Sequence, residues 1–334
     1  MEEGPFHESS KSSSSTDQKL KVLYIVGEDR SGSTILGNVL GQIDGFFSVG
    51  EIQHIWRRGL IEDWPCSCGV TFRECALWQE VIARAFGDMP RVDAEKLLTL
   101  RERGLRTRHL LPMPARKSPQ ERVSLMGKEY LHAVERLYHA VHLASQSRII
   151  VDTSKSPAYG YILETIPSIE LYMLHLVRDS RAVAYSWTKR RKPEPGLRDQ
   201  HDGRMPYRGP IEIALLWNER NYVIERTWRH KPKRYTLMRY EDFVESPKYA
   251  LQRCLAFLDE EQSQLPAFVS EHEVLLREIH NFSGNPDRFQ RGTTQINASD
   301  EWQSEMSTFQ KVLVTIITSP WLMRYKYPLL DRSS

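Results

Sequence analysis

The sequence lacks the features that mark several specialised classes of protein. No apolar run approaches the roughly 20 residues that a helix needs to span a bilayer, so no membrane span is expected. The formal net charge of the 334 residues is only +3, and nucleic acid is not expected as a partner. Cysteines number four, and residues 1–18 are polar and serine-rich without an apolar signal core. We therefore expect a disordered tail and a reducing, cytoplasmic setting.

Residues 19–334 have the pattern of one α/β domain. Apolar runs that end in polar loops alternate with helical patterns, which predicts a P-loop-type parallel sheet flanked by helices on both faces. Residues 52–146 are mostly helical and form a predicted helical insertion. The predicted strands are 21–27, 45–50, 148–152, 169–177 and 235–240, with helices at 33–42, 181–190, 211–229 and from 241 to 258.

A short loop after the first predicted strand has the character of an anion site. Gly27, Gly32 and Thr34 occupy positions of the ATP-binding phosphate loop, G-x-x-x-x-G-K-[ST]. The lysine of that motif is missing, because position 33 is a serine, and Arg30 places a positive charge inside the loop instead. Loop N–H groups and a helix N-terminus attract anions. The stretch predicts a phosphate site for a ligand other than a triphosphate–magnesium complex.

A second anion site is predicted further along the chain. Arg178 closes a strand, Ser186 lies about two turns into the next helix, and Arg190 follows on the same helix face. Lys155 and Tyr240 also come just after predicted strands. Because ligands of such sheets bind at the carboxyl ends of the strands, these groups are expected along one edge. Two anion sites on one sheet suggest a ligand with phosphates at two ends.

At this point the sequence resembles a known family. The runs V-G-E-D-R-S-G-S-T at 26–34 and L-V-R-D-S-R-A-V-A-Y-S at 176–186 resemble the 5′-phosphosulfate loop and the 3′-phosphate motif of sulfotransferases. The similarity is greatest to tyrosylprotein and carbohydrate sulfotransferases and their bacterial relatives, with 19–334 as one sulfotransferase domain. It implies transfer of a sulfuryl group from 3′-phosphoadenosine 5′-phosphosulfate (PAPS) to an acceptor hydroxyl, without a metal. The acceptor would be a carbohydrate, a glycolipid or a hydroxylated metabolite.

The resemblance implies a role for each matching residue in binding PAPS. The 5′-phosphosulfate would be held by Arg30, Ser31, Gly32, Ser33 and Thr34. The 3′-phosphate would be held by Arg178 and Ser186, assisted by Arg190 or Tyr240. The segment 284–292 resembles the part of bacterial members that closes over the nucleotide, with Arg288 and Arg291 as candidates.

The resemblance also implies three catalytic residues. Lys155 would stabilise charge on the bridging oxygen, and Arg30 would neutralise the leaving phosphate. Glu51 resembles the acid that serves as the catalytic base. In the tyrosylprotein branch a second acid follows directly, whereas this sequence has Ile52. The base is therefore left open between Glu51 and His54, one helical turn later.

Three cysteines close together raise the question of a metal. Cys66, Cys68 and Cys75 fall one short of a tetrahedral set, and a Cys-x-Cys pair fits a metal less well than Cys-x-x-Cys. His54 could be a fourth ligand, although nothing in the spacing requires it. Reduced packing cysteines are therefore favoured, and no metal is predicted.

The acceptor site is expected between the helical insertion and a proline- and glycine-rich excursion at 193–210, which could act as a mobile lid. Basic residues there hint at a polar or anionic acceptor, and aromatic ones could stack on rings. The basic residues are Arg101, Arg103, Arg106, Arg108, Arg116 and Lys117, and the aromatic ones are Trp56, Trp64 and Tyr207. The sequence does not indicate an oligomeric state.

Two other functions stay open at this stage. A P-loop kinase using ATP would need a lysine at position 33, and Asp152 could be its magnesium-holding acid. A non-enzymatic module that binds a bisphosphorylated nucleotide would keep both anion sites but would need neither a base nor Lys155.

Overall fold

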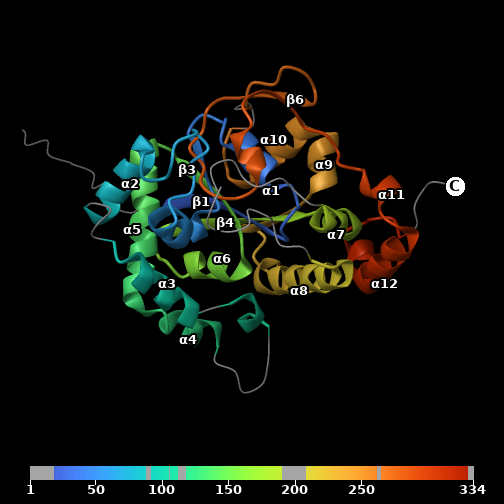
Figure 1. Ribbon diagram of the computed structural model, residues 1–334, viewed down its shortest axis with the longest axis horizontal. Coiled ribbons are helices and arrows are strands. Elements are labelled where there is room, and N and C mark those ends of the chain that lie inside the picture. Colours follow the sequence, from blue (N-terminus) through green and yellow to red (C-terminus); the bar gives the residue numbers. More distant parts are fainter. Residues whose placement is uncertain are drawn as a thin grey trace, which may run out of the picture.

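The computed structural model describes residues 19–87, 92–104, 106–111, 118–189, 208–261 and 265–329. At its centre is a five-stranded parallel sheet in the order β2-β3-β1-β4-β5 (Figure 1). The strands are β1 (Leu20–Gly27), β2 (Phe46–Gly50), β3 (Ile149–Lys155), β4 (Ile169–Val177) and β5 (Tyr235–Arg239). The predicted parallel α/β sheet is confirmed.

Both faces of the sheet are covered, and β1 shows why its sequence is apolar throughout. Val22, Tyr24 and Val26 belong to one buried cluster, whereas Leu23 and Ile25 belong to another. Side chains alternate between the faces of a strand, so a central strand needs apolar residues at every position when helices cover both faces. All five side chains are fully buried.

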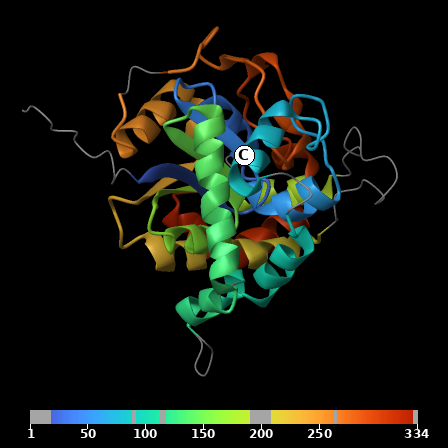
Figure 2. The same ribbon diagram turned by 90° about the vertical axis from the view of Figure 1, so that its left-hand side faces the viewer.

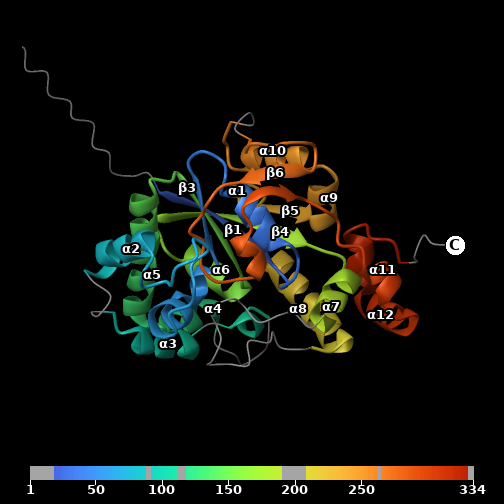
Figure 3. The same cartoon turned by 45° about the horizontal axis from the view of Figure 1, so that its top comes forward.

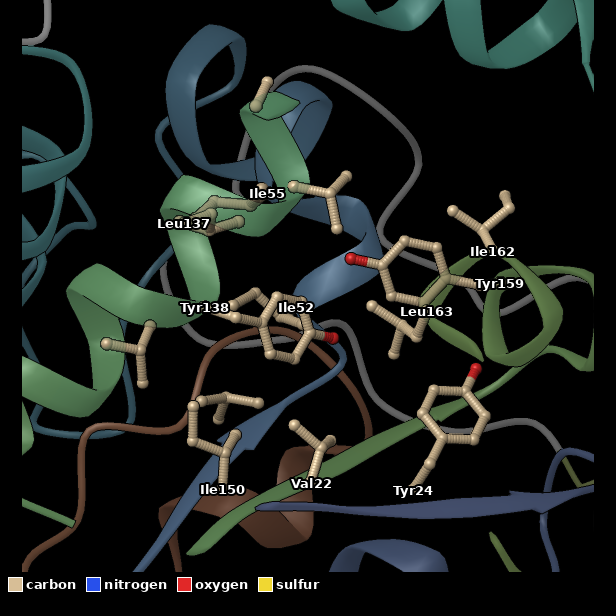
Figure 4. Close-up of a cluster of buried hydrophobic side chains, with 14 of the residues drawn as sticks. Val22, Tyr24, Ile52, Ile55, Leu137, Tyr138, Ile150, Tyr159, Ile162 and Leu163 are labelled. Atoms are coloured by element: carbon tan, nitrogen blue, oxygen red, sulfur yellow. The ribbon is translucent and has the colours of Figure 1, made fainter. Parts of the chain in front are cut away.

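Helices cover the two faces in separate groups (Figure 1). Figure 4 shows one side of this packing, where Val22 and Tyr24 of the sheet lie below Tyr138, Tyr159 and Leu163 of the covering helices. Helices α5 (Gly127–Ser145), α6 (Pro157–Glu164) and part of α8 (Pro210–Trp228) cover this face, and α1 (Ser33–Leu40), α9 (Tyr240–Glu245) and α10 (Pro247–Phe257) cover the other.

The insertion that follows β2 is predominantly helical where it is described. It ends in α5, which runs along the side of the molecule that faces the viewer in Figure 2. Before α5 come η1 (Ile52–His54), a π-helix η2 (Ile55–Ile61), α2 (Ala76–Phe86), α3 (Ala94–Arg103), η4 (Thr107–His109) and α4 (Pro119–Ser124).

The C-terminal part adds a strap and a helical group to the sheet. Residues 277–300, here called the strap, run between β6 (Glu273–Leu276) and α11 (Trp302–Glu305). The strap contains η5 (Pro286–Phe289) and β7 (Gly292–Gln295), which pairs antiparallel with β6. Figure 3 shows it in orange, passing in front of α1 and the sheet. Helix α12 (Thr308–Arg324) packs on α7 (Ser180–Thr188) and α8.

The structure moves several predicted boundaries. Strand β3 continues to Lys155, where a polar loop from 153 was predicted, because Lys155 still pairs with Val26 of β1. Strand β5 ends at Arg239, and Tyr240 begins α9. The tail 1–18, Arg116, Lys117, Arg190, and residues 193–207 of the predicted lid with Tyr207 lie outside the described residues. Within the described ranges, no helix combines the length and apolarity needed to span a bilayer.

Candidate active site

The loop between β1 and α1 is folded tightly at the carboxyl edge of the sheet. Arg30 and Gly32 both have positive φ, +71° and +86°. A Cβ at Gly32 would lie 2.3 Å from the ring of Tyr240, so only glycine fits there. In the described part of the chain, no side chain caps α1, and the buried Ser31 Oγ has no hydrogen-bond partner. Unsatisfied donors at a helix N-terminus suit an anion.

Lys155 lies between this loop and the end of β2. Strand β3 is hydrogen-bonded to both β1 and β2, so its last residue comes next to the residues that follow them. The Lys155 ammonium forms an ion pair with Glu51, and it lies 3.6 Å from an Asp29 carboxylate oxygen. Burial opposes the ammonium, but Glu51 and Asp29 raise the pKa of Lys155 above its ordinary value. The side chain is therefore a buried cation at neutral pH.

Both candidate bases lie at this place. Glu51 follows β2, and its N–H donates to the carbonyl of Phe282 in the strap at 2.9 Å. The second oxygen of Glu51 lies 3.7 Å from Nε2 of His54 and 3.8 Å from a nitrogen of Arg58. Burial, with Arg58 and Arg101, lowers the pKa of His54 well below its usual range, so the imidazole is neutral. His54 lies beside Glu51 and not in the cysteine group, which corrects its expected alternative role as a metal ligand.

The second predicted anion site joins the first through Arg178. Its guanidinium donates to the carbonyls of Arg30, at 2.9 Å, and Ser299, at 3.2 Å. It also lies over the ring of Tyr240, 4.8 Å from its centre. The hydroxyl of Tyr240 donates to the carbonyl of Asn297 at 3.1 Å. The strap therefore contacts both the arginine and the tyrosine.

The remaining predicted residues lie at varying places around this edge. Ser33 and Thr34 begin α1, and Ser186 is buried on α7. Arg288 is buried in η5 and donates to the carbonyl of Gly284 at 3.0 Å. Arg291 instead pairs with Glu278, at 2.9 Å, and donates to the carbonyl of Ser67 at 2.9 Å, which places it beside the cysteine loop.

Several charged neighbours were not singled out from the sequence. Asp29 lies within the loop motif itself, so its contact with Lys155 could have been considered. Arg58, which directly follows Arg57, and Arg220 carry no local signal, because both lie in helical patterns outside any recognised motif. Arg220 of α8 pairs with Glu28 at 3.2 Å and donates to the carbonyl of Gly27 at 3.4 Å.

Asp152 does not serve the kinase alternative. Its carboxylate is fully buried, where it accepts from the hydroxyl of Tyr138 and from the N–H of Ser154, the latter at 2.7 Å. Burial raises its pKa to about 6. The acid that was considered as a magnesium ligand therefore faces the helix that covers the sheet and not the phosphate loop.

Comparison with known proteins gives one decisive match. A model described as "Sulfotransferase family" matches residues 23–264, which is most of the chain. No curated protein matches the chain. Similar solved structures include the sulfotransferase domain of the curacin biosynthetic pathway, which is 18% identical with a TM-score of 0.49, over 94% of this chain and 100% of that one. The sulfotransferase domain of the Synechococcus PCC 7002 olefin synthase is 17% identical, with a TM-score of 0.49 over 96% and 100%. A sulfotransferase from Alicyclobacillus acidocaldarius is 14% identical, with a TM-score of 0.41 over 91% and 93%.

Proposed function

The chain belongs to the sulfotransferase family, and we propose that it transfers a sulfuryl group from PAPS to a hydroxyl of an acceptor. The observation that carries this proposal is the buried ammonium of Lys155, held between Glu51 and Asp29 beside the phosphate loop. Cation, candidate base and anion loop thus meet at the end of three adjacent strands. This is the set of groups that an in-line transfer between two oxygens requires.

The residues of the loop fit the donor. Ser31 Oγ, the N–H groups at the start of α1 and the positive charge of Arg30 would hold the 5′-phosphosulfate. Arg178, Ser186 and Tyr240 would hold the 3′-phosphate. The Arg178 guanidinium donates a hydrogen bond to the carbonyl of Arg30, and this bond fixes the separation of the two proposed anion sites.

Glu51 and Lys155 have complementary tasks in the proposed reaction. PAPS supplies the sulfuryl group, and its bisphosphate nucleotide leaves. Lys155 and Arg30 stabilise the negative charge that forms on the leaving phosphate. Glu51 takes the proton of the acceptor hydroxyl, with His54 as the alternative base. The Glu51 oxygen that does not pair with Lys155 lies 3.7 Å from the neutral imidazole of His54 and 3.8 Å from the Arg58 guanidinium, so it is the better placed of the two oxygens to accept that proton.

The helical insertion supports a polar or anionic acceptor of small size. A cavity of about 450 Å³ is lined by Glu102, Arg103, Gly104, Arg106, Arg108, His109 and Arg122. Four arginines against one glutamate favour an acidic ligand. Neighbouring Arg101 donates to the carbonyl of Gln53 at 2.7 Å, which connects this end of α3 to the segment after Glu51. Acidic carbohydrates, glycolipids and hydroxylated metabolites meet this description, and a cytoplasmic enzyme remains the prediction.

The first test is calorimetric titration with 3′-phosphoadenosine 5′-phosphate (PAP), the spent donor, against ATP with magnesium. We expect micromolar binding of PAP that is weakened by roughly 10- to 150-fold in Arg178→Ala. Arg234→Ala is a matched control. Arg234 also lies over the ring of a tyrosine, Tyr172, at 4.5 Å, but it directly precedes β5 and so lies at the amino ends of the strands, away from the proposed site. Preference for ATP would support the kinase alternative. PAP binding without transfer from PAPS to any of a panel of hydroxyl acceptors would support the binding module.

A further inference from the structure

Four potential metal ligands meet outside the proposed catalytic site. Sulfur atoms of Cys66, Cys68 and Cys75 and a ring nitrogen of His280 all lie within 4.8 Å of one another. The cysteines come from the loop before α2, whereas His280 lies in the strap, 205 positions after Cys75. We propose that these residues bind one zinc ion as a structural Cys₃His site, which differs from the packing role favoured by the sequence.

Three of the distances between the ligand atoms are close to those of a tetrahedral zinc site, and all of the ligand atoms lie within 4.8 Å of one another. Zn–S bonds near 2.3 Å and Zn–N bonds near 2.0–2.1 Å give tetrahedral edges of about 3.8 Å between sulfurs and about 3.6 Å between sulfur and nitrogen. The Cys68 and Cys75 sulfurs are 3.8 Å apart. Nδ1 of His280 is 3.4 Å from the sulfur of Cys75 and 4.0 Å from that of Cys66.

The chemistry of the four ligands also favours zinc. Thiolates with one imidazole select zinc over magnesium or calcium, which prefer oxygen ligands. All four cysteines of the chain lie in the described residues as free thiols, and the fourth, Cys254, is buried in α10. A disulfide would use only two of the clustered thiols and would leave the third and the imidazole without a role.

The backbone holds the ligands in place before any metal binds. Cys66 is bridged to Phe282, and the turn that follows, closed by the N–H of Gly69 on the carbonyl of Cys66 at 3.0 Å, brings Cys68 back beside Cys66. Ser67 donates from its hydroxyl to the carbonyl of Ile279 at 2.6 Å and from its N–H to that of Asn281 at 3.1 Å. The indole of Trp78 donates to the carbonyl of His280 at 3.0 Å. Such outer contacts fix the orientation of a ligand and its affinity for metal.

The position of the cluster gives the metal a structural consequence. Two residues after His280, Phe282 pairs with the backbone on both sides of Gly50, accepting from the N–H of Glu51 and donating to the carbonyl of Val49. A Cβ on Gly284 would lie 3.2 Å from the Glu51 carboxylate, which shows how closely the strap passes. Zinc would therefore fix the strap to the insertion next to Glu51. This last step rests on the proposed role of Glu51, whereas the zinc site itself does not.

The test is metal analysis of the full chain, expressed with zinc in the medium and purified without chelator. We expect about one zinc per chain, as in other closed four-ligand sites. Cys75→Ser and His280→Ala should lose at least nine tenths of it, and His280→Cys should retain it. Cys254→Ala is the matched control, because it removes a buried cysteine outside the cluster. After exchange, Co²⁺ should give the intense visible bands of a tetrahedral thiolate site.

Two outcomes would overturn the proposal. One is a folded wild-type chain without stoichiometric zinc and without the tetrahedral Co²⁺ spectrum. The other is a zinc content that is the same in the wild type, Cys75→Ser and His280→Ala. If the variants fail to fold, the wild type still decides, because a strong chelator should remove the zinc and lower the thermal midpoint. Zinc without sulfate transfer would count only against the proposed function, and transfer without zinc only against the metal site.

Discussion

At one half of the carboxyl edge of the sheet, where β1, β2 and β3 end, the charged side chains form ion pairs with one another. Lys155 contacts Glu51 and Asp29, and a second cation, Arg58, lies 3.8 Å from Glu51. At the other half, behind β4 and β5, the buried Arg178 contacts carbonyl oxygens and the ring of Tyr240. Among the described residues, no carboxylate forms an ion pair with Arg178, so its charge is less compensated than that of Lys155, and the charges of the first half largely cancel. The first half is therefore suited to moving protons and charge, and the second to holding an anion.

The largest expected effect separates the two candidate bases of the first half. Glu51→Gln keeps the size of the side chain but removes the proton acceptor, so we expect kcat to fall by roughly 10²–10⁴. His54→Asn should keep kcat within about tenfold, because its contact with Glu51 at 3.7 Å is longer than a hydrogen bond. Steady-state kinetics with PAPS decides, and PAP titration checks that the donor still binds. The reverse ranking would assign the base to His54.

Lys155→Ala tests the cation of the same half. We expect kcat to fall by about 10²–10³, because charge on the leaving phosphate loses its stabilising group, and PAP affinity to change much less. Lys231→Ala is a matched control, because Lys231 also forms an ion pair with a glutamate, Glu164, at 2.7 Å, and this pair lies outside the proposed site. Nearly normal turnover in Lys155→Ala would remove the basis for distinguishing the halves, as would the same result for Arg30→Ala.

Arg178→Ala tests the second half. A charged hydrogen-bonding partner contributes about 1.5–3 kcal/mol, so PAP should bind roughly 10- to 150-fold more weakly, while kcat at saturating PAPS falls only a few-fold. The affinity of the wild type should fall as salt is added, and this dependence should be weaker in the variant. A variant with a large loss in kcat and unchanged PAP affinity would show that both halves act in the chemical step.

The features that the sequence predicted correctly depend on local contacts, and those that it missed depend on contacts between distant segments. The loop around Gly32, the strand ends at Arg178 and Tyr240, and the parallel sheet were predicted because each depends on a short stretch of chain. The ends of elements were less certain, as β3 shows by pairing through Lys155. A polar residue can extend a strand when its backbone finds a partner, and the sequence alone does not indicate that partner.

Contacts between distant segments could not be predicted. His280 joins the cysteine loop only because the strap passes β2, and no spacing in the sequence connects His280 with Cys75. His54 was the nearer histidine in sequence, but it lies beside Glu51. Arg291 matched the closing segment by motif and lies beside Ser67 and Glu278, so its role in donor binding stays a prediction.

The smallest effect concerns Gly32, where the two halves touch. Gly32→Ala should destabilise the fold by roughly 1–2 kcal/mol for its positive φ alone, measured by denaturant unfolding. Gly127→Ala is the matched control, with φ at +74° and, in the described chain, no heavy atom within 4 Å of the added Cβ. At Gly32 the Cβ would meet the ring of Tyr240 at 2.3 Å, so this variant should also weaken PAP binding, because the loop and Tyr240 must separate. Equal stability loss and intact PAP binding in both variants would mean that the contact between the halves is adjustable and that each anion site acts alone.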